Sequence, residues 1–115
     1  MSVGIIFGET DSFRFKVALR SPKAARRRDY VKVWHEPEGW VLCQIVRITR
    51  SNERFSEGSV FENEVVDSPT DKLVAHVEVI GSRDEFGNLR LPMTPFSPGD
   101  KVFKADVQLI RRVLG

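Results

Sequence analysis

Residues 13–19 read FRFKVAL, and an apolar side chain occupies every second position of this stretch, from Phe13 and Phe15 to Leu19. Successive side chains of a β-strand point to opposite faces, so the apolar residues share one face and the two cationic residues lie on the other. This alternation is typical of an antiparallel sheet with one face in the core and one face in water. The stretch therefore predicts a half-buried strand, with Phe13 and Phe15 in the core.

Other strand-like segments lie on both sides of this stretch. Short apolar or alternating runs, separated by residues that favour turns, occur at 3–8, 29–36, 40–50, 72–80, 89–91 and 101–104. The segments at 29–36 and 40–50 predict a hairpin around a Pro- and Gly-containing turn at 37–39. Three prolines at 92–98 exclude a helix between the last two strands.

The end of the chain predicts a short helix. Asp106 can accept backbone N–H groups as an N-cap. Apolar residues recur after it at near-helical spacing, namely Val107, Ile110 and Leu114. Many short strands with almost no helix favour a barrel or a sandwich, and closure removes the strand edges that invite aggregation. We therefore predict an all-β fold: a small closed or partly open antiparallel β-barrel at 1–105 and a short helical junction at 106–115.

The composition is that of a soluble protein with one domain. The 115 residues suffice for one core, and no run approaches the roughly 18 apolar residues that cross a bilayer. The N-terminus lacks the basic start and apolar block of a signal peptide, so we expect a cytoplasmic protein without a membrane partner. The single cysteine, Cys43, excludes an internal disulfide.

Charge is distributed unevenly along the chain. Residues 1–56 carry eleven Lys or Arg against six Asp or Glu, although the net charge of the whole chain is only +2. The sharpest basic run consists of Lys23, Arg26, Arg27 and Arg28. Residues 57–71 contain no basic residue and five acidic ones, Glu57, Glu62, Glu64, Asp67 and Asp71. We therefore expect a polarised surface, which can steer a partner or make two copies complementary.

The basic run permits three interpretations. It is a solvated loop between strands, a phosphate contact whose affinity falls with salt, or a contact with another subunit. Tyr30, Trp34 and Trp40 could stack on bases, as in barrels that bind single strands, or the two tryptophans could cover the end of the barrel. The segment at 51–70 has little periodicity and is expected to be a long surface excursion.

Residues able to perform catalysis are scarce. The sequence has no Gly-x-x-x-x-Gly-Lys-Ser/Thr loop, so we expect neither ATP binding nor a cofactor in this segment. His35, Cys43 and His76 lie on three different predicted strands, and a zinc site or a nucleophile pair would require them to converge. The simpler interpretation is a core cysteine and two histidines that lie at the surface or form hydrogen bonds in the core. We therefore predict no catalytic residue and no metal ligand.

Four segments resemble a known family in their order along the chain: Val3 to Gly8, Asp29 to Val33, Val41 to Thr49, and Pro98 to Phe103 with Ala105 to Gly115. Together they resemble the N-terminal HAS barrel of archaeal HerA-type DNA translocases. The resemblance implies a barrel in front of a RecA-like motor domain that carries the phosphate loop, in a hexameric ring that pumps duplex DNA. It also implies a NurA-type nuclease as partner, a role in DNA end resection and repair, and a chain that ends where the motor begins.

Two hypotheses about function follow. The first is a non-catalytic barrel that organises a translocase ring and receives a nuclease. The second is a stand-alone barrel that binds nucleic acid through the basic run and exposed aromatic side chains. A third, an enzyme that uses His35, Cys43 or His76, requires these side chains to gather in one pocket.

The ring hypothesis makes a prediction about charge. Each interface of a cyclic ring joins two different patches, which must complement each other. We predict that Arg26, Arg27 and Arg28 of one barrel face the acidic residues at 57–71 of the next. The alternative is two solvated loops of opposite sign.

Overall fold

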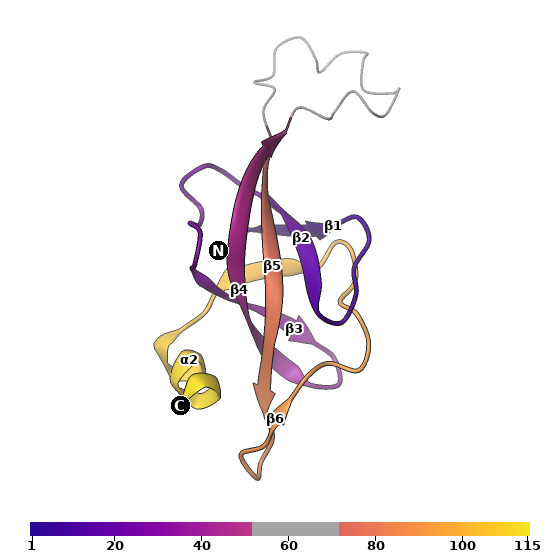
Figure 1. Cartoon of the computed structure of the whole chain (residues 1–115), viewed down its shortest axis with the longest axis vertical. Coiled ribbons are helices and arrows are strands. Elements are labelled where there is room, and N and C mark those ends of the chain that lie inside the picture. The colour runs from indigo at the N-terminus through magenta and orange to yellow at the C-terminus, as the bar shows by residue number, and fades with distance from the viewer. Residues whose placement is uncertain (52–71) are drawn as a thin grey trace.

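In the computed structural model, β-strands wrap around one core and a helix lies against the outside (Figure 1). The structure describes residues 1–51 and 72–115, so the acidic run at 57–71 lies outside the described residues. The elements in chain order are β1 (Gly4–Phe7), β2 (Arg14–Leu19), β3 (Tyr30–His35), β4 (Gly39–Ser51), β5 (Lys72–Arg83), β6 (Leu89–Arg90), β7 (Lys101–Lys104) and α2 (Val107–Leu114).

Antiparallel pairing closes six of the strands into a barrel. They follow the order β2-β1-β7-β3-β4-β5, and β2 also pairs with β5, so each of the six has a neighbour on both sides. The short strand β6 pairs with the end of β5 and extends outside the closed ring. The predicted all-β barrel is confirmed in its closed form.

Alternation along each strand fills the barrel. Phe15 and Val17 of β2 are buried and pair in register with Val77 and Ala75 of β5, which are buried as well. The other strands contribute inward side chains at every second position, among them Val31, Val33, Val41, Cys43 and Val102. Because successive side chains of a strand point to opposite faces, the sequence neighbours of these residues lie on the outer wall.

Loops close both ends of the barrel. Phe96, from the proline-rich segment between β6 and β7, is buried and packs edge-on against Phe15, with ring centroids 5.3 Å apart. Thr10 Oγ1 donates a hydrogen bond of 2.8 Å to the carbonyl oxygen of Phe96. At the other end, Ala25 from the loop between β2 and β3 enters the same core. The faces that remain open to partners are therefore the outer walls.

The prediction that Phe13 belongs to the core is wrong. Its side chain is 61% exposed. The Oδ1 atom of Asp11 accepts the backbone N–H groups of Phe13 and Arg14, at 2.7 and 2.8 Å, and this turn holds Phe13 ahead of the strand. Strand β2 begins only at Arg14, so the alternation of the sequence starts one residue before the alternation of the structure.

Helix α2 packs on the outside of β4 and β5. Its N-cap is Asp106, as predicted, and Oδ2 of this residue accepts the N–H of Leu109 at 3.1 Å. The buried side chain of the helix is Val113, whereas Val107 and Leu114 are exposed. The helix has eight residues, and within the described ranges no helix is long and apolar enough to span a bilayer.

Two residues of the barrel explain why the helix lies there. Leu42 is fully buried although its neighbours on β4 fill the barrel interior, so its side chain faces outward, toward the side on which α2 packs. Arg83 of β5 donates from Nε and Nη2 to the carbonyl oxygen of Val113, at 3.1 and 2.8 Å. The last carbonyls of a helix lack partners inside the helix, so this guanidinium satisfies one of them.

Candidate interaction surface

Two tryptophans lie side by side on the outer wall formed by β3, β4 and β7. Trp34 and Trp40 are direct cross-strand partners, and their sequence neighbours Val33 and Val41 are fully buried. Alternation therefore turns both indoles outward. The ring centroids of the two tryptophans are 5.3 Å apart, and those of Trp40 and Phe103 are 5.9 Å apart, both edge-on. Edge-to-face contacts of this kind orient the three rings with respect to one another.

Lys32 completes this surface. Its Nζ atom lies 4.4 Å from the ring centroid of Trp40 and 3.1 Å from Oδ1 of Asp106. The hydrogen bond from Lys32, helped by backbone N–H groups that include that of Leu109, lowers the pKa of Asp106. The patch that we call the aromatic surface consists of Lys32, Trp34, Trp40 and Phe103.

The aromatic surface is open to solvent. Trp34 is 48% exposed and Trp40 is 37% exposed. A hollow of about 410 Å³ lies between Trp40 and α2, and another of about 340 Å³ lies between Trp34 and the turn before β7. Protein interfaces use exposed aromatic side chains beside such hollows as anchors. The two tryptophans thus lie on the wall of the barrel and do not cover its end.

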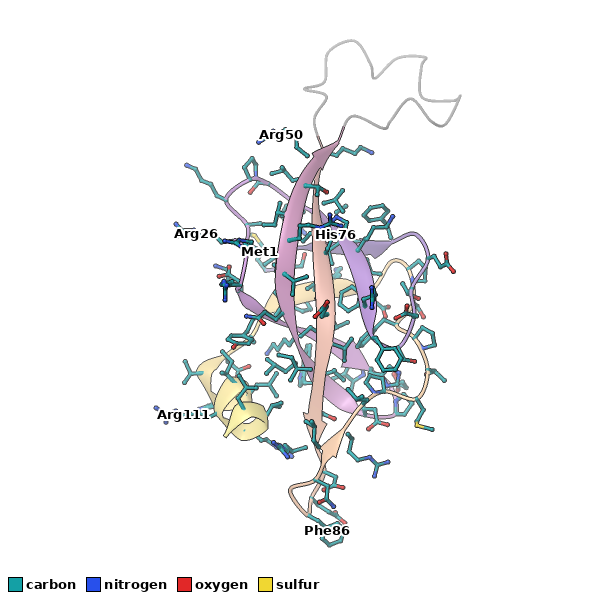
Figure 2. All side chains as sticks on the ribbon, in the orientation of Figure 1. Met1, Arg26, Arg50, His76, Phe86 and Arg111 are labelled. Atoms are coloured by element: carbon teal, nitrogen blue, oxygen red, sulfur yellow. The ribbon has the colours of Figure 1, made fainter. Side chains whose placement is uncertain are left out.

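The predicted basic run forms a loop with a fixed backbone between β2 and β3. Oδ2 of Asp29 accepts the N–H of Arg26 at 2.9 Å, and the N–H of Asp29 donates to the carbonyl of Arg26 at 3.1 Å. Arg28 has a φ of 81°, and its N–H donates to the carbonyl of Ile45 at 2.7 Å. Figure 2 shows Arg26 at the side of the barrel. The basic loop exposes all four predicted side chains, Lys23, Arg26, Arg27 and Arg28.

The structure does not bring the basic loop and the tryptophans together. The loop leads into the start of β3, whereas Trp34 lies near the end of that strand. Asp29, at the base of the loop, lies 4.0 Å from the ammonium group of Lys104 at the end of β7. The cations and the indoles therefore form two separate surfaces at opposite ends of one strand.

The family model of the HAS barrel domain matches residues 3–85. The chain belongs to the HAS-barrel family. HAS barrels form the N-terminal domain of HerA-type ATPases, so the resemblance seen in the sequence is confirmed at the level of the domain. No curated protein matches the chain. The matched residues include Trp34 and Trp40 and stop before Phe103 and α2.

This HAS barrel keeps the three side chains of catalytic interest apart. Cys43 is fully buried, and burial raises the pKa of its thiol, which disfavours the reactive thiolate. His35 is also buried inside, where its Nε2 atom lies 3.1 Å from the carbonyl oxygen of Thr94. His76 lies on the outer wall, between the buried residues Ala75 and Val77 of β5. Among residues 1–51 and 72–115, no three metal-ligating side chains form a cluster.

Sequence reasoning missed two members of the aromatic surface. Lys32 shares the outward face of β3 with Trp34, so the alternation alone could have indicated it. Phe103 joins through its pairing with Lys32 between β7 and β3. No local pattern specifies that pairing, because the two strands lie far apart in the sequence.

Proposed function

We propose that this HAS barrel is the non-catalytic N-terminal module of a hexameric HerA-type DNA translocase, in which it organises the ring and docks a NurA-type nuclease during DNA end resection. The family match supports the ATPase context. The aromatic surface carries the docking part of the proposal, because it offers exposed ring anchors beside two hollows. In this proposal residues 106–115 form the junction toward the motor domain.

The charge of the aromatic surface favours a protein partner over nucleic acid. The carboxylate of Asp106 lies 3.1 Å from the ammonium group of Lys32 and compensates its charge. A phosphate backbone would have to displace that carboxylate, since nucleic-acid affinity depends on neutralising phosphates with cations. A protein can instead bury the indoles of Trp34 and Trp40, and buried aromatic anchors dominate the affinity of many protein interfaces.

Titration calorimetry of the chain with a NurA-type nuclease tests the docking surface. The double variant Trp34→Ala/Trp40→Ala should bind at least about tenfold more weakly, as expected for hot-spot residues. Phe86→Ala is the matched control, because Phe86 is 80% exposed at the turn after β5 and does not belong to the aromatic surface (Figure 2). Equal affinity of the double variant and the wild type would exclude the aromatic surface as the docking site.

The basic loop would contribute to the ring. In this part of the proposal, Arg26, Arg27 and Arg28 of one barrel face the acidic run at 57–71 of the next. Surface ion pairs contribute about 0–1 kcal/mol each, so they would orient subunits more than hold them. Changing the three arginines to glutamate in a HerA-type protein that carries this barrel should reduce self-association in sedimentation velocity. Unchanged assembly would rule this contact out.

Nucleic-acid binding by the basic loop is a second candidate function. It is favoured by the exposed cations of the loop, none of which forms an ion pair with another described residue. Because the tryptophans lie at the other end of β3, such binding would use phosphate contacts without base stacking. Each phosphate contact contributes a slope of about −0.9 to a plot of log affinity against log salt for duplex DNA. Tight DNA binding with a steep slope, together with no nuclease binding, would favour this function.

A further inference from the structure

A row of basic groups crosses three adjacent strands on the wall opposite β7. Lys16 of β2 pairs in register with His76 of β5, and His76 pairs with Arg47 of β4. The β4–β5 register shifts between Ile45 and Arg47, and this irregularity places Arg47 opposite His76. All three side chains point outward, because their inward neighbours, such as Val77, belong to the core. The row is therefore a product of barrel closure, which brings β2 beside β5.

The hydrogen bonds of His76 indicate which ring nitrogen carries the hydrogen. Nη2 of Arg47 lies 3.4 Å from Nδ1 of His76, and Oγ1 of Thr49 lies 3.0 Å from Nε2. A guanidinium can only donate, so Nδ1 accepts and the neutral ring carries its hydrogen on Nε2. Burial and the positive charges of Arg47 and Lys16 lower the pKa of His76. The row thus places the imidazole of His76 between the side chains of Arg47 and Lys16, and the ammonium group of Lys16 also lies 5.2 Å from the ring centroid of Phe7.

A recess of about 510 Å³ opens over this row. Four further charged residues line it, namely Arg14 and the three carboxylates Glu9, Asp11 and Glu78. The carboxylate of Asp11 accepts two backbone N–H groups in the turn before β2, and Glu78 lies opposite Arg14 in the β2–β5 backbone register. Glu9 lines the recess from the turn after β1. Within the described part of the chain, neither Lys16 nor Arg47 has a carboxylate within ion-pair distance.

We propose that this recess binds a phosphate group, held between Lys16 and Arg47 and in contact with His76. Lysine and arginine side chains that form no ion pair can bind phosphate at a concave site, and arginine presents a fork of donors that matches the phosphate oxygens. A volume of about 510 Å³ lies in the range of small-molecule sites, so a nucleotide fits as well as the end of a nucleic acid strand. The site is independent of the aromatic surface, which lies on the other wall.

Binding of an anion would also move a proton. A phosphate between the two cations screens His76 from their charge and can accept a hydrogen bond from the protonated ring. The pKa of His76 should therefore rise when phosphate binds, with the proton taken from solvent. His35, buried inside the barrel at the end closed by Phe96, should not respond.

NMR of the two histidine rings in the whole chain tests the proposal. The probes are inorganic phosphate, adenosine monophosphate and a 5′-phosphorylated oligothymidine. We expect saturable shifts of the His76 signals with at least one probe, and a higher His76 pKa in its presence. Lys16→Met and Arg47→Met should each weaken this binding about tenfold, as expected for loss of a charge-assisted contact. Arg111→Met is the control, because it removes an exposed arginine on α2.

The outcomes separate the sources of phosphate. Equal affinity for the mononucleotide and the oligonucleotide supports a nucleotide site, whereas a strong preference for the oligonucleotide supports a strand end. Signals of His76 that no probe shifts would overturn the proposal. Wild-type affinity in both Lys16→Met and Arg47→Met would also overturn it. The His35 signals of each variant show whether its barrel is folded. Neither result depends on nuclease docking, so this test and that of the aromatic surface fail independently.

Discussion

The two walls of the barrel share one core but differ on the outside. The wall of β3, β4 and β7 presents indole rings, with Trp34 and Trp40 at its centre, whereas the wall of β2, β5 and the far half of β4 presents Lys16, Arg47 and His76. The inward positions of both walls are filled mostly by valine, alanine and isoleucine. A period of two fixes only the inward half of each strand. The outward half is thus free to differ, and the two walls differ there.

The largest expected effect comes from a substitution in the core, which the two walls share. Ile45 is buried in the core on β4, the strand that contributes to both walls. Ile45→Ala should lower the free energy of unfolding by about 2–5 kcal/mol, through lost burial and the cavity left behind. Urea denaturation measures this change, and the binding proposed for each of the two surfaces should weaken together.

The adjacent residue provides a matched control for this substitution. Val46 lies at the irregularity of β4 and is 37% exposed. Val46→Ala should change the free energy of unfolding by less than about 1 kcal/mol, as is usual for surface substitutions. Equal losses at the two positions would contradict the division into a shared interior and independent exteriors.

The inward face of β3 was predictable from the sequence, and so were most element boundaries. Val31, Val33 and His35 alternate with Tyr30, Lys32 and Trp34 in the sequence, and the structure buries all three of the first set. The prediction for Phe13 failed because a hydrogen-bonded carboxylate, that of Asp11, set the start of β2. The spacing of apolar residues does not reveal a turn of this kind.

The outward half was predictable only in part. The exposure of the basic loop follows from its composition, but the recess over Lys16, Arg47 and His76 depends on the pairing of β2 with β5. Barrel closure joins residues as distant as Lys16 and His76, and a single register shift sets the position of Arg47. Long-range register is decided by the packing of the whole core, so no local pattern of charges reveals this row.

The second expected effect concerns α2, which lies beside the aromatic surface. Arg83 holds α2 against β5 through two N–H groups on the carbonyl of Val113, and α2 lines the hollow beside Trp40. Arg83→Met should lower the free energy of unfolding by about 1–2 kcal/mol, because a helix carbonyl loses its partners. Tryptophan fluorescence should change while the His76 NMR signals stay in place. Arg90→Met, on exposed β6, is the control and should change neither.

A smaller effect is expected within the aromatic surface itself. Lys32→Met removes the cation that lies over Trp40, which contributes about 0.5–1 kcal/mol at such sites. The pKa of Asp106 should rise, because the hydrogen bond from Lys32 is the largest cause of its lowering. Carboxyl NMR titration measures this rise. Lys101→Met, an exposed lysine on β7, should leave the pKa of Asp106 unchanged, and an equal rise in both variants would contradict the assignment of the cause to Lys32.

The smallest expected effect is a pH dependence of stability that comes from His76. The folded chain lowers the pKa of His76 below its ordinary value of 6.5, so the unfolded chain takes up a proton more readily there. The stability that this contributes is present above pH 6.5 and is lost as the pH falls through the lowered pKa. Urea denaturation at pH 7 and at pH 5, values that bracket the ordinary histidine pKa of about 6.5, should show a smaller decline for His76→Gln than for the wild type. Saturating phosphate should reduce the decline of the wild type alone, since it favours the protonated ring. An equal pH dependence of both proteins would contradict a lowered pKa of His76 in the folded chain.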